Sequence, residues 1–338
     1  MDHVRVVPGL ALRRARVLLL LGPQAQQAEH TCRGEAEGGR AVTVLAGYAP
    51  GHRLSGVLEL ASAVATALDE NLLVATVTPP RWNVPSLARV DAEFAQWAEQ
   101  QGDETLAEAR SALERLAPEL PVSYRRVDHR SASSALLSIA EETSASVVVV
   151  GSCEDGRRGW VELGSTSDSL VHSARLPVAI APRGYEGPGP GQGFSSITCA
   201  VTEHDAEADA AIIAMAAYLA GRAGVPLRLV TFAVRLGTMY PSYVGYGVED
   251  ELADAAREHA ETLFARWRGA GVIADDVETV VGLGHGWRAA MDSIAWDDAG
   301  LLILGSKPHG TLSQVFLGSS ATKIVRHSPI PVLVLPAG

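Results

Sequence analysis

The segment Val147-Val-Val-Val-Gly-Ser152 and the segment Leu301-Leu-Ile-Leu-Gly-Ser306 repeat one pattern, an apolar run followed by Gly-Ser, at an offset of 154 residues. The same offset relates the later matches, which are Leu163-Gly-Ser165 with Leu317-Gly-Ser319 and Pro177-Val178 with Pro331-Val332. No gap is needed anywhere in this stretch. Because self-similarity at a fixed offset marks a repeated structural unit, the chain is predicted to contain two copies of one domain.

Length, composition and charge are consistent with this prediction. A chain of 338 residues is about right for two domains, and 47% hydrophobic residues can form real cores. The formal net charge of −11 repels phosphate, so no nucleic-acid partner is expected. No run of about 18 apolar residues occurs, so we expect no membrane insertion and a cytoplasmic protein. Cys32, Cys153 and Cys199 form no Cys-x-x-Cys pair or metal-spaced cluster, so no metal is expected.

Each copy alternates strands with helices, five strands with four helices per copy. Strands are predicted over residues 41–46, 72–77, 122–127, 147–150 and 178–181, and again over residues 197–201, 227–234, 277–281, 301–304 and 332–335. Alternating elements with fully apolar strands indicate a parallel sheet covered by helices on both faces. The predicted fold class is therefore α/β, with two doubly wound five-stranded parallel-sheet domains.

The domain boundaries follow from composition. Residues 1–40 are predicted to be a weakly ordered extension, because their polar run 24–37 buries too little surface to offset the ordering entropy. Residues 41–183 form the first domain and residues 196–338 the second. Residues 184–195 between them are rich in glycine and proline and are predicted to be a linker.

Two glycine-rich loops carry the functional signal, residues 151–165 and residues 305–319. Each follows a central strand, where open parallel sheets bind ligands, and each precedes a helix whose N-terminus favours anions. Gly151, Gly164 and Ser165 fall on the first and last positions of the pattern Gly-x2-Gly-x9-Gly-[Ser/Thr], as do Gly305, Gly318 and Ser319. In these loops and in the closing strands, the chain resembles the universal stress protein family over all but the extension and the linker.

The resemblance implies an adenine nucleotide alpha hydrolase-like fold and ATP as the cofactor, with its phosphates and ribose held by these loop residues. It also implies a role in the cytoplasmic stress response through a nucleotide or a protein partner. In this family the closing strands commonly pair across a dimer interface. We therefore expect residues 178–181 and 332–335 to pair within this chain and form a pseudo-dimer, with further dimerisation possible.

The sequence also departs from the family pattern. Glu154 and Pro308 replace the second glycine of the two loops, and Gly47-Tyr48 and Thr202 stand where the nucleotide-binding branch has an aspartate. A carboxylate beside phosphate and a proline without an N–H both disfavour binding. We therefore expect ATP to bind weakly or not at all. Any binding should use the second domain, where Lys307 adds a cation to Gly305, Gly318 and Ser319.

Other residues have simpler interpretations. Ser165 is predicted to cap the last helix of the first copy in a box with Asp168, while Ser319 fits a cap and a phosphate contact about equally. His129 and His285 are predicted to be solvated loop residues. The other notable side chains, expected to pack over the neighbouring domain, are Tyr240, Tyr243 and Tyr246.

No motif pairs a nucleophile with a base, so no catalytic residue is assigned. The leading hypothesis is a non-catalytic stress-response protein with degenerate nucleotide-binding loops. One alternative is an ATP-binding sensor with slow hydrolysis in the second domain. Another is a cytosolic regulatory subunit of a transporter or kinase.

Overall fold

The computed structural model describes residues 43–49, 56–80, 90–201, 206–235, 247–309 and 314–336. The predicted extension of residues 1–40 lies outside these ranges. So do Thr202 and the three loop tyrosines, Tyr240, Tyr243 and Tyr246.

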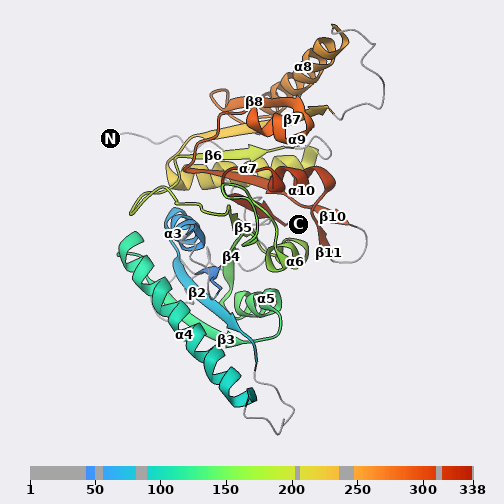
Figure 1. Ribbon diagram of the computed structural model, residues 1–338. Coiled ribbons are helices and arrows are strands. Elements are labelled where there is room, and N and C mark those ends of the chain that lie inside the picture. Colours follow the sequence, from blue (N-terminus) through green and yellow to red (C-terminus); the bar gives the residue numbers. More distant parts are fainter. Residues whose placement is uncertain are drawn as a thin grey trace, which may run out of the picture.

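Ten strands form one continuous sheet in the order β3-β2-β1-β4-β5-β12-β9-β6-β7-β8 (Figure 1). The strands of the first half are β1 (Thr43–Gly47), β2 (Asn71–Thr78), β3 (Val122–Asp128), β4 (Ala145–Gly151) and β5 (Val178–Ala181). Those of the second half are β6 (Ser196–Ala200), β7 (Leu227–Arg235), β8 (Glu278–His285), β9 (Gly300–Gly305) and β12 (Val332–Leu335). Neighbouring strands within each half are parallel, so the predicted fold class is confirmed.

Helices cover both faces of this sheet, and each face carries one continuous core. One buried cluster joins residues of α3 (Gly56–Leu68), α4 (Val90–Leu116), α7 (Ala206–Ala223) and α8 (Gly247–Gly269). The other joins residues of α5 (Ala132–Thr143), α6 (Ser165–Ser173), α9 (Gly286–Asp292) and α10 (Ser319–Arg326). Within β4, Val147 and Val149 belong to the first cluster and Val148 and Val150 to the second, which explains the unbroken apolar run.

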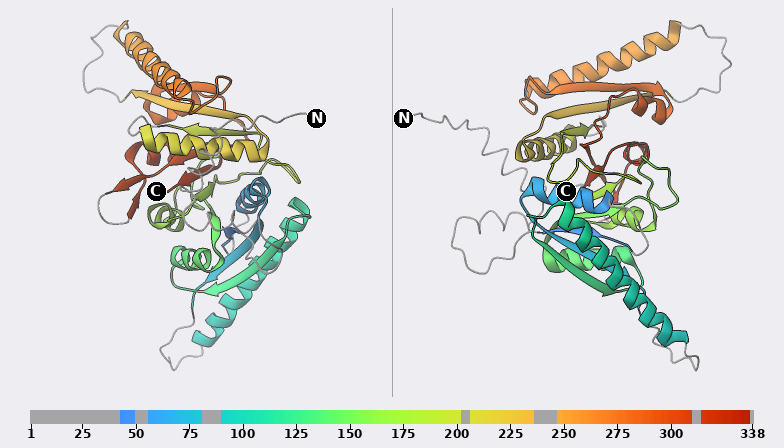
Figure 2. Two further views of the ribbon diagram at one scale, coloured as in Figure 1. Left: turned by 180° about the vertical axis from the view of Figure 1, so that it is seen from behind. Right: turned by 60° about the vertical axis from the view of Figure 1, so that its left-hand side comes forward.

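The two halves join at a seam between β5 and β12, the one antiparallel contact between strands of this sheet in the described part of the chain. Val332 faces Ile180, Leu333 faces Ala179 and Val334 faces Val178, and all six side chains are buried. The predicted pairing of the closing strands is therefore confirmed. This pairing covers two sheet edges that would otherwise be exposed, and the two halves lie side by side in one sheet (Figure 2).

Helices strengthen the joint beside the seam. Helix α3 contacts α7, its counterpart in the other half. At the end of α3, Arg222 Nη2 donates a hydrogen bond to the Leu68 carbonyl oxygen at 2.5 Å. The sheet and this helix pair together make the interface apolar at its centre and polar at its margin.

The segment between the halves contains no helix or strand, and it is packed against the first domain. Tyr185 and Phe194 are buried in the first core, and the Gly191 N–H donates to the Leu116 carbonyl oxygen at 3.0 Å. Gly187 has φ 69°, and a Cβ there would lie 2.2 Å from Glu59 Oε2, so only glycine fits. The linker thus lies along the first domain.

Two local features complete the fold. Helix α9 is short and ends at Asp292. Ser293 Oγ donates to the Ala290 carbonyl oxygen and accepts from the Leu283 N–H, which favours an end there. An additional hairpin, β10 (Lys307–His309) with β11 (Gln314–Phe316), follows β9 and was not predicted. Among the described residues, no helix is both long and apolar enough to cross a bilayer.

Candidate functional site

The two glycine-rich loops flank the seam. The first follows β4 and leads to α6, and the second follows β9 and leads to α10. Since β4 and β9 are separated only by β5 and β12, both loops lie at the middle of the ten-stranded sheet. The topology thus brings the two sets of predicted residues to the region where the domains meet.

The start of α6 differs from the predicted cap. Gly164 is the N-cap, and Ser165 is the first helical residue, with an exposed side chain. The Gly164 N–H donates to Ser167 Oγ at 2.9 Å, and the Asp168 N–H donates to the Gly164 carbonyl oxygen at 2.9 Å. The prediction that Ser165 caps this helix is therefore wrong, because the helix begins one residue earlier than the cap assignment required.

Backbone donors of the first loop are largely used by acceptors of the protein itself. The donor–acceptor pairs are Cys153 N to Glu162 O (2.8 Å), Gly156 N to Cys153 O (3.2 Å), Arg157 N to Glu162 Oε1 (3.2 Å), Gly159 N to Arg183 O (2.7 Å), Trp160 N to Arg157 O (3.3 Å) and Val161 N to Ser328 O (3.2 Å). Arg183 Nη1 also donates to the Gly156 carbonyl oxygen. These N–H groups are engaged, so the loop is folded on itself rather than open toward a ligand.

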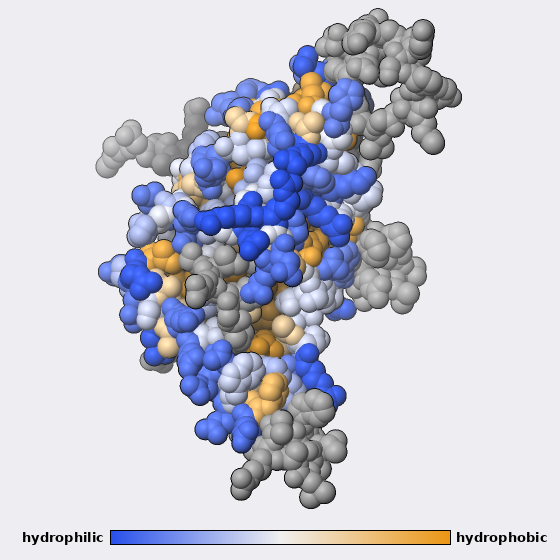
Figure 3. Space-filling model, in the orientation of Figure 1, coloured by the Kyte–Doolittle hydropathy of each residue, from blue (hydrophilic) through white to orange (hydrophobic). Residues whose placement is uncertain are grey.

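The first loop also docks on the second domain through Trp160. The Trp160 ring lies 5.6 Å from the Arg157 guanidinium and 5.3 Å from that of Arg288 on α9. It meets the ring of His327, after α10, edge-on at 6.5 Å. Figure 3 shows strongly hydrophilic side chains gathered over the middle of the molecule, on the side that Figure 1 views. The sequence analysis assigned no role to Trp160. The pattern that could have indicated one is a large aromatic residue inside a loop of small and charged residues.

The second loop is built differently. Its arms pair as the hairpin β10–β11, with Pro308 opposite Val315, and β11 contacts α6 of the first domain. Proline at this position supplies no N–H, as expected. Gly305 ends β9, and Ser306 is buried with its N–H bonded to the Leu335 carbonyl oxygen at 2.8 Å.

The start of α10 is the more favourable of the two helix ends for an anion. Gly318 is its N-cap and Ser319 its first residue, with an exposed side chain. No acidic residue lies in the first turn of α10, whereas α6 carries Asp168 there. Because a helix N-terminus carries partial positive charge, a carboxylate in the first turn offsets it in the first domain only.

In the first domain, a buried side chain fills the position where the nucleotide-binding branch has an aspartate. Tyr48 is 7% exposed, and its N–H donates to the Ala75 carbonyl oxygen at 2.9 Å. Burial raises the pKa of Tyr48, and nearby Glu108 raises it further. Because the phenol of Tyr48 is buried in the core, it cannot take the place of the aspartate of the nucleotide-binding branch.

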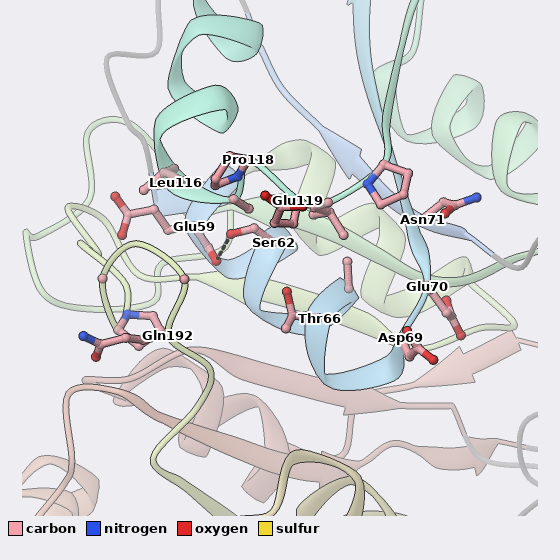
Figure 4. A pocket seen from close by; sticks show the side chains of 17 residues that line it. Glu59, Ser62, Thr66, Asp69, Glu70, Asn71, Leu116, Pro118, Glu119 and Gln192 are labelled. Carbon is pink, nitrogen blue, oxygen red and sulfur yellow. Dashed lines mark hydrogen bonds between the residues drawn. The ribbon is translucent and has the colours of Figure 1, made fainter.

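A cavity of about 440 Å³ lies at the opposite edge of the first domain, by the amino ends of β2 and β3 (Figure 4). Its walls are α3, the segment after α4, and the linker. The ionisable residues that line it are Glu59, Asp69, Glu70 and Glu119, all acidic. None of the predicted site residues lines this cavity, and its charge disfavours phosphate.

The remaining candidates are structural. His129 and His285 are exposed, as predicted, but His285 is the last residue of β8 rather than a loop residue. His129 Nδ1 lies 3.0 Å from the Ser131 N–H. Cys199 is fully buried, and burial raises its pKa. Within the described ranges, no three His, Cys, Asp or Glu residues are grouped as a metal site.

Comparison with known proteins agrees with the repeat and the sheet. A model of the universal stress protein family matches residues 43–182 and again residues 193–336. The universal stress protein Rv2319c of Mycobacterium tuberculosis is 42% identical over 295 residues, which cover 87% of this chain and 100% of that protein.

Two solved structures are similar in fold. The functionally unknown protein PA1789 of Pseudomonas aeruginosa has a TM-score of 0.54 at 16% identity, covering 88% of this chain and 93% of its own. A universal stress protein of Archaeoglobus fulgidus has a TM-score of 0.53 at 17% identity, covering 88% and 98%. Since the family model matches both halves and Rv2319c aligns over its full length, this chain belongs to the universal stress protein family.

Proposed function

We propose that this chain is a non-catalytic, cytoplasmic regulatory protein in which the first glycine-rich loop joins the two domains instead of binding a nucleotide. The observation that carries the proposal is the set of hydrogen bonds inside that loop. A phosphate site needs several converging N–H donors, and here Arg157, Gly159 and Val161 donate to protein oxygens. One of those oxygens, that of Ser328, belongs to the second domain.

The charge of the first loop supports the same proposal. Glu154 and Asp155 are exposed side chains at the turn where the family pattern has glycine. Bringing a triphosphate to this turn would place like charges close together, which costs most in a partly desolvated loop. Signalling would then pass through the joined surface of the two domains to a protein partner.

A second candidate function is a weak ATP sensor that uses the second domain. The exposed Ser319 and the absence of an acid from the first turn of α10 favour it. The loss of the Pro308 N–H and the pairing of β10 with β11 remove backbone donors. We therefore expect an ATP Kd between about 1 μM and 1 mM, a binding free energy of roughly −4 to −8 kcal/mol.

Isothermal titration of ATP–Mg²⁺ into the full chain tests both candidates, with Gly164→Ala and Gly318→Ala as a matched pair. Both glycines have negative φ, −84° and −56°, so the backbone tolerates alanine at either position. Gly318→Ala should weaken any binding, and Gly164→Ala should leave it within about twofold. Pro308→Gly should strengthen binding, and Glu154→Gly should do less.

Mass spectrometry of the denatured, freshly purified protein gives an independent readout of any co-purified nucleotide. Nanomolar ATP affinity in the natural chain would contradict the proposal. So would binding that Gly164→Ala abolishes and Gly318→Ala does not.

A further inference from the structure

Glu162 places a carboxylate inside the first loop. Its Oε1 accepts a hydrogen bond from the Arg157 N–H at 3.2 Å. Its Oε2 lies 3.0 Å from where a Cβ on Gly156 would be, so the carboxylate sits against the backbone of the Gly156–Arg157 turn. This is the chemistry by which backbone N–H groups hold an anion, with an oxygen of the chain as the acceptor.

The backbone of Glu162 fixes the side chain in this place. The Glu162 carbonyl oxygen accepts from the Cys153 N–H at 2.8 Å, and the Glu162 N–H donates to Ser152 Oγ at 3.3 Å. Ser152 Oγ donates in turn to the Ala181 carbonyl oxygen at the end of β5, at 2.8 Å. Because Glu162 is tied to both β4 and β5, its carboxylate reaches the turn without a flexible tether.

The second loop has no such group. The residue related to Glu162 by the 154-residue repeat is Phe316, which lies in β11 and carries no charge. The internal carboxylate is therefore specific to the first copy, as is the docking of Trp160 on the second domain.

We infer that Glu162 is the specificity-determining residue of the first loop, an internal anion that closes the loop against phosphate. The inference rests on the proposed function, in which the first loop does not bind nucleotide. It adds a cause for that property: the chain's own carboxylate engages a donor that a phosphate oxygen would need. Glu154 and Asp155 then add repulsion to a loop that is already closed.

The test compares Glu162→Ala, Glu162→Gln and the control Glu186→Gln in the full chain. Glu186 pairs with Arg158 at 3.1 Å and its side chain is 81% exposed, so its substitution removes the same charge next to the loop without opening it. Inorganic tripolyphosphate is the calorimetric probe, and hydrogen exchange of the Arg157 amide is the second readout. Circular dichroism confirms that each variant is folded.

Glu162→Ala should speed exchange of the Arg157 amide at least tenfold and tighten tripolyphosphate binding at least tenfold. Glu162→Gln keeps an acceptor oxygen, so its gain in affinity should be smaller, and Glu186→Gln should change affinity less than twofold. The inference is overturned if the Arg157 amide of Glu162→Ala exchanges at the natural rate. It is also overturned if exchange is faster but Glu162→Ala binds tripolyphosphate no more tightly than Glu186→Gln does. A failure of the proposed function would be seen differently: ATP would slow hydrogen exchange of the first-loop amides in the natural chain.

Discussion

Truncation of Ile180 to alanine tests whether the seam makes the two halves one cooperative unit. Ile180 lies on β5 opposite Val332 of β12, with no exposed surface. The substitution removes three buried carbons at about 0.8 kcal/mol each, and the cavity left behind raises the cost to about 2–5 kcal/mol. At about 2 °C per kcal/mol for a chain of this size, the Tm should fall by about 4–10 °C.

Differential scanning calorimetry measures the outcome. Since both cores run across the seam, the natural chain should unfold in one transition, with calorimetric and van't Hoff enthalpies that agree. Ile139→Ala is the control, an equal truncation at a 1% exposed side chain of α5, away from the seam. It should lower the same single transition by a similar amount.

Two resolved transitions in the natural chain would refute the reasoning. A second refuting result is an Ile180→Ala variant whose Tm stays within about 1 °C of the natural chain. Either result would mean that the β5–β12 pairing adds little to the stability of the halves.

Two further predictions concern single side chains. Trp160→Ala loses two cation–π contacts, at about 0.5–1 kcal/mol each for exposed cations, so urea unfolding should show a loss of about 1–2 kcal/mol. The control Trp97→Ala, at a 54% exposed ring on α4, should cost less than half of that, and an equal loss would count against the contact between the loop and the second domain. Burial raises the pKa of Cys199, so its thiol should stay unreactive toward a disulfide reagent at pH 8 until the chain unfolds. The Cys199 thiol ionises at a lower pH in the unfolded chain than in the folded chain, so this group should lower the free energy of unfolding as the pH rises above about 8.5. Fast labelling of Cys199 in the folded chain would contradict its burial.

Sequence patterns predicted the structural features that depend on the order of neighbouring residues along the chain. The apolar run of residues 147–150 indicated a strand buried on both faces, and β4 contributes to both cores. The glycines of the two loops placed them correctly at the ends of β4 and β9. Helix ends were less well predicted. Near Ser165, both Gly164 and Ser165 fit the cap position, and hydrogen bonding of Ser167 decides between them.

The two α/β copies could be predicted from the amino-acid sequence, because a fixed repeat offset and alternating elements are properties of the chain order. How the copies contact each other depends on tertiary packing and could not be predicted in this way. Trp160, Arg288 and His327 are far apart in the sequence and converge because the seam places the first loop against the second domain. The carboxylate of Glu162 likewise meets the Arg157 N–H in the folded loop, where Ser152 connects the backbone of Glu162 to the end of β5. Residue type sets which contacts are possible, and the packing of the ten-stranded sheet selects which of them form.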